Sequence, residues 1–152
     1  MLERLEQLIN DVSTLNSKLI LLIAPPNSGK SKLLRDASEQ LALPLITVGV
    51  ALGLELLPIP IAQRPLKAAE LLRVLAAKNG SQTAILFDDI EILFDSTLKL
   101  DPIELLKRQA RAIPVVVAWP GDMAHGRLTY ATAGHPEHRD YAIDGFAPFD
   151  VN

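Results

Sequence analysis

The run from Ala24 to Ser31 holds the residues with the clearest chemistry in this chain. It reads Ala24-Pro25-Pro26-Asn27-Ser28-Gly29-Lys30-Ser31 and fits the phosphate-binding loop pattern G-x-x-x-x-G-K-[ST], with alanine where the first glycine is usual. Such a loop curls its backbone N–H groups around the α- and β-phosphates, while Lys30 brings a cation to the β- and γ-phosphates. The Ser31 hydroxyl is a ligand for Mg²⁺. The residues expected to bind ATP, or another nucleoside triphosphate, are Ala24, Pro25, Pro26, Asn27, Ser28, Gly29, Lys30, Ser31 and Lys32.

A second motif follows an apolar run that begins at Ala84 and ends in two carboxylates, Asp88 and Asp89. This is the Walker B pattern, in which Asp88 holds Mg²⁺ directly or through water. A carboxylate in the next position can orient and deprotonate the attacking water, so Asp89 is the expected catalytic base. Aspartate is one methylene shorter than the glutamate of many ATPases, which favours slow hydrolysis or hydrolysis that needs a partner. Glu91 is a second candidate base, expected to face solvent.

An arginine from an adjoining subunit often completes such a site, because charge on the γ-phosphate must be neutralised in the transition state. Arg108, Arg111, Arg127 and Arg139 are the candidates. We expect Arg111 and Arg127 to be the catalytic ones. The alternative for each is a solvated side chain or a surface ion pair.

Four other side chains have a possible role at a site. Trp119 and Tyr130 could stack on adenine or pack in the core, and core packing is favoured. Trp119 also stands where many ATPases carry a polar residue that senses the γ-phosphate. The sequence therefore shows no polar residue for that sensor role at this position. His135 and His138 have a metal-like spacing, but no predicted helix or strand frames them, which favours ordinary polar roles.

The elements that must position these residues follow from the hydrophobic pattern. Residues 1–16 predict an amphipathic helix that packs on a sheet or contacts a neighbouring subunit. The other expected elements are a strand at 19–23, a helix from 29–30 to 41, a strand at 45–50, a helical turn and loop at 51–65, and a helix at 66–78 with Leu66, Ala69, Leu72, Leu75 and Ala76 inward. Further on we expect a strand at 83–89, a helix at 101–112 capped by Asp101, a strand at 113–119, and an irregular tail over 122–152 with one short strand near 128–131.

Alternating strands and helices predict an α/β fold with a mostly parallel sheet. Ligands bind such sheets outside the carboxyl ends of the strands. The phosphate loop and Asp88 both follow strands, so we expect them to meet in one site.

Composition limits the class of protein. A chain of 152 residues with 49% hydrophobic content is expected to form one domain over residues 1–152. No apolar window is long enough to span a bilayer, the amino terminus lacks a signal-peptide core, and there is no cysteine, which together favour the cytoplasm of a microbe. The net charge of −3 argues against a protein that coats nucleic acid by itself, but leaves room for a local patch that faces DNA.

Several blocks of the sequence resemble the BrxF family, small P-loop proteins encoded in type III BREX phage-defence operons. The blocks are Met1-Leu2-Glu3-Arg4-Leu5, Ala24 to Ser31, Asp88-Asp89-Ile90-Glu91-Ile92-Leu93-Phe94, Val117-Ala118-Trp119-Pro120-Gly121, and Gly126-Arg127-Leu128-Thr129-Tyr130 with Gly134-His135-Pro136-Glu137. The resemblance implies a three-layer P-loop NTPase with an AAA+-like core and no lid domain. It also implies work with other BREX proteins in a complex that distinguishes methylated self DNA from phage DNA.

Three functions remain open at this point. The first is an ATPase or ATP-dependent switch that forms a homo-oligomer within a BREX complex, with any DNA contact indirect. The second is an assembly module that binds nucleotide and hydrolyses it negligibly. The third is a small-molecule kinase, which would need a substrate pocket and an arginine-bearing lid that the sequence does not display.

Overall fold

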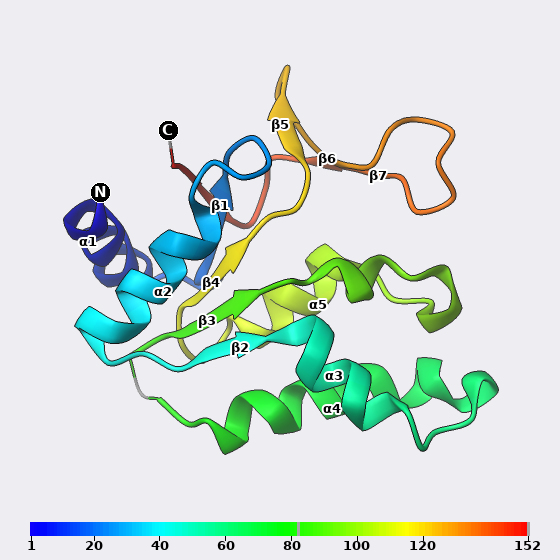
Figure 1. Ribbon diagram of the computed structural model, residues 1–152. Coiled ribbons are helices and arrows are strands. Elements are labelled where there is room, and N and C mark those ends of the chain that lie inside the picture. Colours follow the sequence, from blue (N-terminus) through cyan, green and yellow to red (C-terminus); the bar gives the residue numbers. More distant parts are fainter. Residues whose placement is uncertain (82, 152) are drawn as a thin grey trace.

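A parallel sheet of five strands forms the centre of the molecule in the computed structural model, which describes residues 1–81 and 83–151 (Figure 1). The strands lie in the order β2-β3-β4-β1-β8, and every neighbouring pair is parallel. Their bounds are β1 (Leu19–Ile23), β2 (Leu45–Thr47), β3 (Ile85–Asp88), β4 (Val115–Ala118) and β8 (Ala147–Asp150). The α/β class and the parallel sheet expected from the sequence are confirmed.

Helices cover both faces of this sheet (Figure 1). One face carries α1 (Leu2–Val12) and α2 (Lys30–Leu41), and the other carries α3 (Val48–Leu56), α4 (Arg64–Lys78) and α5 (Pro102–Gln109). The 3₁₀ turns are η1 (Ile61–Gln63), η2 (Glu91–Phe94) and η3 (Ser96–Leu98). In β1, Leu19 and Leu21 enter the apolar cluster under α3–α5, whereas Ile20 and Leu22 enter the cluster under α1 and α2. Burial on both faces explains why β1 is a continuous apolar run.

Strand β4 lies between the two strands that precede the predicted motifs. Val115 pairs with Leu19 of β1 on one side and with Ile85 of β3 on the other. Because the strands are parallel and in register, the phosphate loop after β1 and the carboxylates at the end of β3 emerge at the same edge of the sheet.

The predicted strand at 45–50 is wrong beyond Thr47, where the chain enters α3. A short apolar run does not by itself distinguish a strand from a helix. Here Val48, Leu52 and Leu56 are buried in the core at helical spacing, and this packing decides between the two.

Several helix ends differ from the predicted ones. Helix α1 ends at Val12 rather than 16, and α5 ends at Gln109 rather than 112. Helix α4 begins at Arg64, two residues early, because a proline fits the first turn of a helix. Its buried stripe is Ala68, Leu72 and Ala76, whereas Leu66, predicted to face inward, is 83% exposed.

The helix start predicted at Asp101 is confirmed, since its Oδ1 accepts the N–H of Glu104 at 3.4 Å. The strands predicted at 83–89 and 113–119 are shorter by one or two residues at each end. Over the described ranges, no helix has both the length and the apolar character needed to cross a membrane.

The tail predicted as irregular over 122–152 is ordered over residues 122–151, and Asn152 lies outside the described residues. It forms an antiparallel sheet of β5 (Asp122–Ala124), β6 (Arg127–Tyr130) and β7 (Arg139–Ala142) and then adds β8 to the edge of the parallel sheet beside β1. His125 and Gly126, both with positive φ, form the two-residue turn between β5 and β6. Pro148 is compatible with β8 because β8 is an edge strand.

Candidate phosphate-binding site

A hollow of about 300 Å³ lies where β1, β3 and β4 end. Its lining residues are Pro26, Asn27, Lys30, Ser31, Asp88, Asp89, Glu91, Ala118 and Pro120. The hollow therefore contains residues of both motifs. The prediction that the phosphate loop and the carboxylates lie at one place is confirmed. The remaining predicted loop residues, Ala24, Pro25, Ser28, Gly29 and Lys32, are not among the residues that line it.

The loop between β1 and α2 has a backbone suited to an anion. Asn27 has a φ of 61° and Gly29 a φ of 96°, so two residues close together adopt the left-handed conformation. Alternation of this kind turns successive N–H groups toward one centre. A Cβ built on Gly29 would meet no atom within 4 Å, so the backbone angle rather than crowding favours glycine there.

Alanine at position 24 is accommodated by packing. Ala24 is only 4% exposed and belongs to the apolar cluster with Leu22 and Leu33. It is not among the residues with positive φ, so its backbone does not require glycine. The departure from the usual loop pattern is therefore compatible with an ordinary loop geometry.

Lys30, the first residue of α2, spans the gap between the loop and the end of β4. Its Nζ donates to the carbonyl oxygens of Ala24 at 3.2 Å and Trp119 at 2.6 Å. Partial burial lowers the pKa of Lys30, while the nearby charges of Asp122, Glu91 and Asp88 act in the opposite direction. These two carbonyls thus position the amine at the mouth of the loop. Asp122 was not anticipated from the sequence, because it comes from β5, in the tail predicted to be irregular.

Lys32 points its charge elsewhere. Its Nζ forms an ion pair with Asp36 Oδ2 at 2.8 Å, and its side chain is 72% exposed. Any contact of Lys32 with a phosphate would therefore come from its backbone N–H group.

The carboxylates after β3 are positioned by the backbone. Asp88 Oδ1 accepts the N–H of Asp89 at 2.9 Å, and Asp89 adopts a left-handed φ of 53°, which is uncommon for a residue other than glycine. The carbonyl of Asp89 accepts the N–H of Gly49 in the first turn of α3 at 2.8 Å. A Cβ built on Gly49 would overlap the carboxylate of Asp89. Gly49 therefore makes room for Asp89, a role that the sequence did not reveal.

Glu91, expected to face solvent, is exposed, and as the first residue of η2 it also lines the hollow. Loss of hydration raises its pKa, and the charges of Asp89 and Asp88 raise it further, whereas Lys30 lowers it. The hollow thus has three carboxylates around one lysine, and Glu91 remains a candidate base beside Asp89.

Neither predicted catalytic arginine lies at this hollow. The carbonyl of Arg111 accepts from Nζ of Lys18, the residue before β1, so Arg111 lies at the amino ends of the strands, across the sheet from the hollow. Arg127 of β6 forms an ion pair with Asp140 of β7 at 2.8 Å, half exposed to solvent. Arg139 donates to the carbonyl of Leu100 at 2.9 Å. A role for Arg111 or Arg127 would require a second chain and stays a prediction.

The two aromatic candidates pack in the core. Trp119 is fully buried, its ring meets Phe94 edge-on at 5.4 Å, and its indole N–H donates to the carbonyl of Thr129 at 3.0 Å. Tyr130 stacks on Phe94 with ring centroids 3.8 Å apart. Core packing, the favoured interpretation for both, is confirmed.

The histidines of the tail take part in local hydrogen bonds. His135 Nδ1 accepts the N–H of Glu137 at 3.0 Å, and His138 Nδ1 lies 3.0 Å from the carbonyl of Ala131. Across residues 1–81 and 83–151, no group of three or more histidine or acidic side chains is arranged to hold a metal ion. A Mg²⁺ ion at the hollow would therefore rest on Ser31 and Asp88, with phosphate and water as its other ligands, which is how Mg²⁺ is usually held beside nucleotides.

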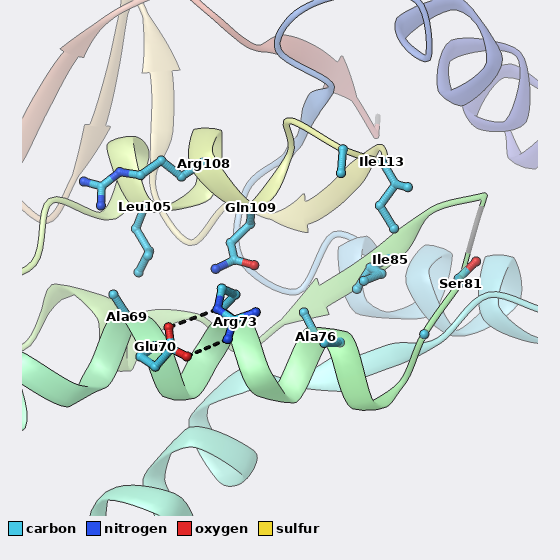
Figure 2. Close-up of a pocket in the computed structure, with 13 residues that line it drawn as sticks. Ala69, Glu70, Arg73, Ala76, Ser81, Ile85, Leu105, Arg108, Gln109 and Ile113 are labelled. Atoms are coloured by element: carbon cyan, nitrogen blue, oxygen red, sulfur yellow. Dashed lines mark hydrogen bonds and ion pairs between the residues drawn. The ribbon is translucent and has the colours of Figure 1, made fainter.

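A larger cavity of about 520 Å³ lies between α4 and α5 (Figure 2). Its lining includes Ile85, the first residue of β3, and Ile113, which lies just before β4. The cavity therefore lies toward the amino ends of the strands. Arg73 is held by two hydrogen bonds to Glu70 on the same helix (Figure 2). Arg108, one of the four arginine candidates, lines this cavity and therefore lies away from the hollow, whereas no residue of the two motifs lines it. The other arginine of its lining, Arg73, is paired with Glu70.

No protein-family model matches the chain, and no curated protein matches it either. The function is therefore inferred from the site itself.

Proposed function

We propose that this chain is an ATP-binding P-loop protein with an AAA+-like core that hydrolyses ATP in the presence of Mg²⁺. The observation that carries the proposal is the hollow in which Lys30 of the loop lies among the carboxylates that follow β3. A lysine and backbone N–H groups facing a cluster of carboxylates are a poor site for a lone anion. They suit an anion that arrives with a divalent cation, as a nucleoside triphosphate does.

Each group has a role in this reaction. The loop N–H groups and Lys30 would bind the phosphate oxygens and offset charge as the γ-phosphoryl group is transferred. Mg²⁺ held by Ser31 and Asp88 would neutralise charge on the β- and γ-phosphates. The oxygen of a water molecule attacks the γ-phosphorus, and the bond between the γ-phosphorus and the β–γ bridging oxygen breaks. A carboxylate accepts a proton from that water. ADP and inorganic phosphate leave.

The first test is equilibrium binding of a fluorescent ATP analogue with Mg²⁺, measured beside phosphate release in the same samples. Saturable binding with phosphate release supports the proposal. No binding of ATP or GTP analogues at millimolar Mg²⁺ would reject it.

Asp89 and Glu91 can be separated as candidate bases by comparing Asp89→Asn with Glu91→Gln. We expect Asp89→Asn to bind ATP like the wild type but to hydrolyse it about 100-fold more slowly, the usual range for loss of a general base. Glu91→Gln is expected to retain hydrolysis within about tenfold, since its charge only adds to the field at the site. Phosphate release with excess ATP measures both. Hydrolysis that survives in Asp89→Asn and is lost in Glu91→Gln would exchange the two roles.

We further propose, from the resemblance to the BrxF family, that the protein acts in the cytoplasm as a homo-oligomer with other BREX proteins, and that its DNA contact is indirect. The blocks of sequence similarity support this part of the proposal. Affinity purification of the tagged chain, expressed from its own operon, would test it. Recovery of the other operon products supports it, and recovery of the chain alone contradicts it.

An arginine supplied in trans is proposed to complete the site, because no arginine is among the residues that line the hollow. If Arg127 acts in this way, its alanine variant and Lys30→Ala are each inactive alone. Mixing them should recover a measurable fraction of wild-type phosphate release, since a mixed junction can combine an intact loop with an intact arginine. The same mixing with an Arg111→Ala variant tests the other candidate. No recovery in either mixture would remove the idea of a shared site.

The lack of an arginine among the residues that line the hollow also favours an alternative function, a nucleotide-dependent assembly module without significant hydrolysis. Asp89 in place of a longer glutamate agrees with it. Saturable ATP binding together with phosphate release no faster than in Lys30→Ala would favour this module over the ATPase.

A further inference from the structure

Helix α3 is apolar on both of its faces. Its inner face is buried through Val48, Leu52 and Leu56. Its outer face carries Val50 and Leu54, with Leu57 directly after the helix, and Glu55 is the only charged residue between Val48 and Leu57. A helix on the surface of a monomer normally turns polar side chains to water. The outer side of α3 therefore calls for another explanation.

The exposed residues form one stripe. Val50, Leu54 and Leu57 follow the spacing i, i+4, i+7, and their exposed fractions are 60%, 63% and 68%. Ile61, the next exposed apolar residue, is 63% exposed in η1. We call Val50, Leu54, Leu57 and Ile61 the α3 face. Four aliphatic side chains at these exposures present on the order of 400 Å² of apolar surface, the size at which patches on soluble proteins mark interaction sites.

The chemistry of the α3 face limits what can cover it. It offers no charge to a nucleic acid or to a strongly charged peptide, so such partners would gain nothing from it. A surface of this kind is complementary to itself, and a two-fold axis lets the same patch serve both partners. Two α3 faces in contact would remove on the order of 800 Å² of side-chain surface, which is below the ~1,200 Å² of stable interfaces and in the range of weak, transient ones. This size fits a dimer that forms and separates with concentration.

The α3 face also lies next to the candidate site. It begins at Val50, directly after Gly49, whose N–H donates to the carbonyl of Asp89 at 2.8 Å. Helices α3 and α4 lie side by side on the sheet face away from α1 and α2 (Figure 1). A chain docked on the amino-terminal end of α3 would therefore lie near Asp89.

We propose that the α3 face is the surface on which a second copy of this chain docks. This inference deepens the homo-oligomer of the proposed function by naming its contact surface, and it does not require nucleotide binding or hydrolysis.

Mass measured by light scattering or sedimentation over a range of concentrations tests the proposal with Leu54→Glu. A buried charge opposite an apolar surface should raise the dimer dissociation constant at least about tenfold. Leu15→Glu is the matched control, because Leu15 is 52% exposed and follows α1 on the other face of the sheet. The control should retain the wild-type dissociation constant. A wild type that stays monomeric throughout, or a Leu54→Glu variant with wild-type mass, would overturn the proposal.

A second measurement gives a positive signal and does not depend on a charge in the fold. The chain has no cysteine, so Leu54→Cys introduces a unique thiol. If two α3 faces meet at the two-fold axis, mild oxidation should join Leu54→Cys chains at least about tenfold faster than Leu15→Cys chains, because the thiols meet at a high effective concentration. Equal rates would count against the α3 face.

Binding of the fluorescent ATP analogue in the same samples keeps this proposal separate from the proposed function. Leu54→Glu is expected to bind the analogue with wild-type affinity. A dimer that depends on Leu54 in a chain that binds no nucleotide would reject the proposed function and support the α3 face. Nucleotide binding together with a dimer that is insensitive to Leu54→Glu would support the proposed function and reject the α3 face.

Discussion

Lys30→Ala is expected to weaken ATP binding about 100-fold or more, the loss that corresponds to one or two charge-assisted hydrogen bonds. The Nζ of Lys30 lies between the carbonyls of Ala24 and Trp119 and is the only cation among the residues that line the hollow. Its removal does more than delete one attraction. The carboxylates that surround it would repel the phosphates without opposition.

Titration with a fluorescent ATP analogue measures this effect, and Lys67→Ala is the control. Lys67 is an exposed lysine on α4, so its removal changes the net charge equally but leaves the hollow intact. The control should keep wild-type affinity within about threefold, the range of surface charge effects. Lys30→Arg should recover only part of the affinity, because a planar guanidinium cannot occupy the place of a compact ammonium between two carbonyls. Equal binding by wild type and Lys30→Ala would show that the nucleotide does not use this loop.

The strands of the parallel sheet that carry the motifs were predictable because their residues are determined locally. Strand β1 is a five-residue apolar run that needs burial on both faces, and α2 follows with Leu33, Leu34 and Ala37 at helical spacing. The same logic placed Asp88 at the end of β3. Local pattern was therefore sufficient to predict that the two motifs meet.

The regions that were predicted wrongly depend on contacts between distant parts of the chain. Strand β6 matches the short strand predicted near 128–131. Strands β5, β7 and β8 were missed because they are three or four residues long and largely exposed, so they carry little hydrophobic periodicity. Part of the antiparallel sheet is held by Trp119, whose indole N–H reaches the carbonyl of Thr129. No local pattern of residues 122–151 records that bond.

The candidate site shows the same division. The loop and Asp88 follow from motif spacing, but the place of Glu91 depends on η2, which turns the chain back toward the loop directly after β3. Gly49 gave only a weak signal, a glycine near the end of a predicted strand. Its meaning emerges from the carboxylate of Asp89, 40 residues later in the chain, which occupies the space of the missing Cβ.

Gly49→Ala is expected to lower kcat about 100-fold while leaving ATP affinity within about threefold, because a catalytic group displaced by about 1 Å loses activity on that scale. The added methyl overlaps the Asp89 carboxylate, and the backbone bond from Gly49 to Asp89 leaves the helix little room to retreat. Asp89 must therefore move. Lys30 and the loop, to which we assign the affinity for ATP in the proposed function, are not among the atoms that the added methyl would meet. Phosphate release at saturating ATP, together with analogue binding, separates the two quantities.

Gly53→Ala is the matched control, since it adds the same methyl four residues later in the same helix. A Cβ there would meet only Ile92 Cδ1 at 3.8 Å, an ordinary contact. Alanine is favoured over glycine inside a helix by about 0.5–1 kcal/mol, so Gly53→Ala should unfold at a slightly higher urea concentration and retain wild-type kcat. Gly49 lies in the first turn of α3, so Gly49→Ala gains at most what Gly53→Ala gains, and a loss of stability would come from the overlap with Asp89. A Gly49→Ala variant with wild-type kcat would mean that the position of the Asp89 carboxylate does not limit hydrolysis, and the role of base would then pass to Glu91.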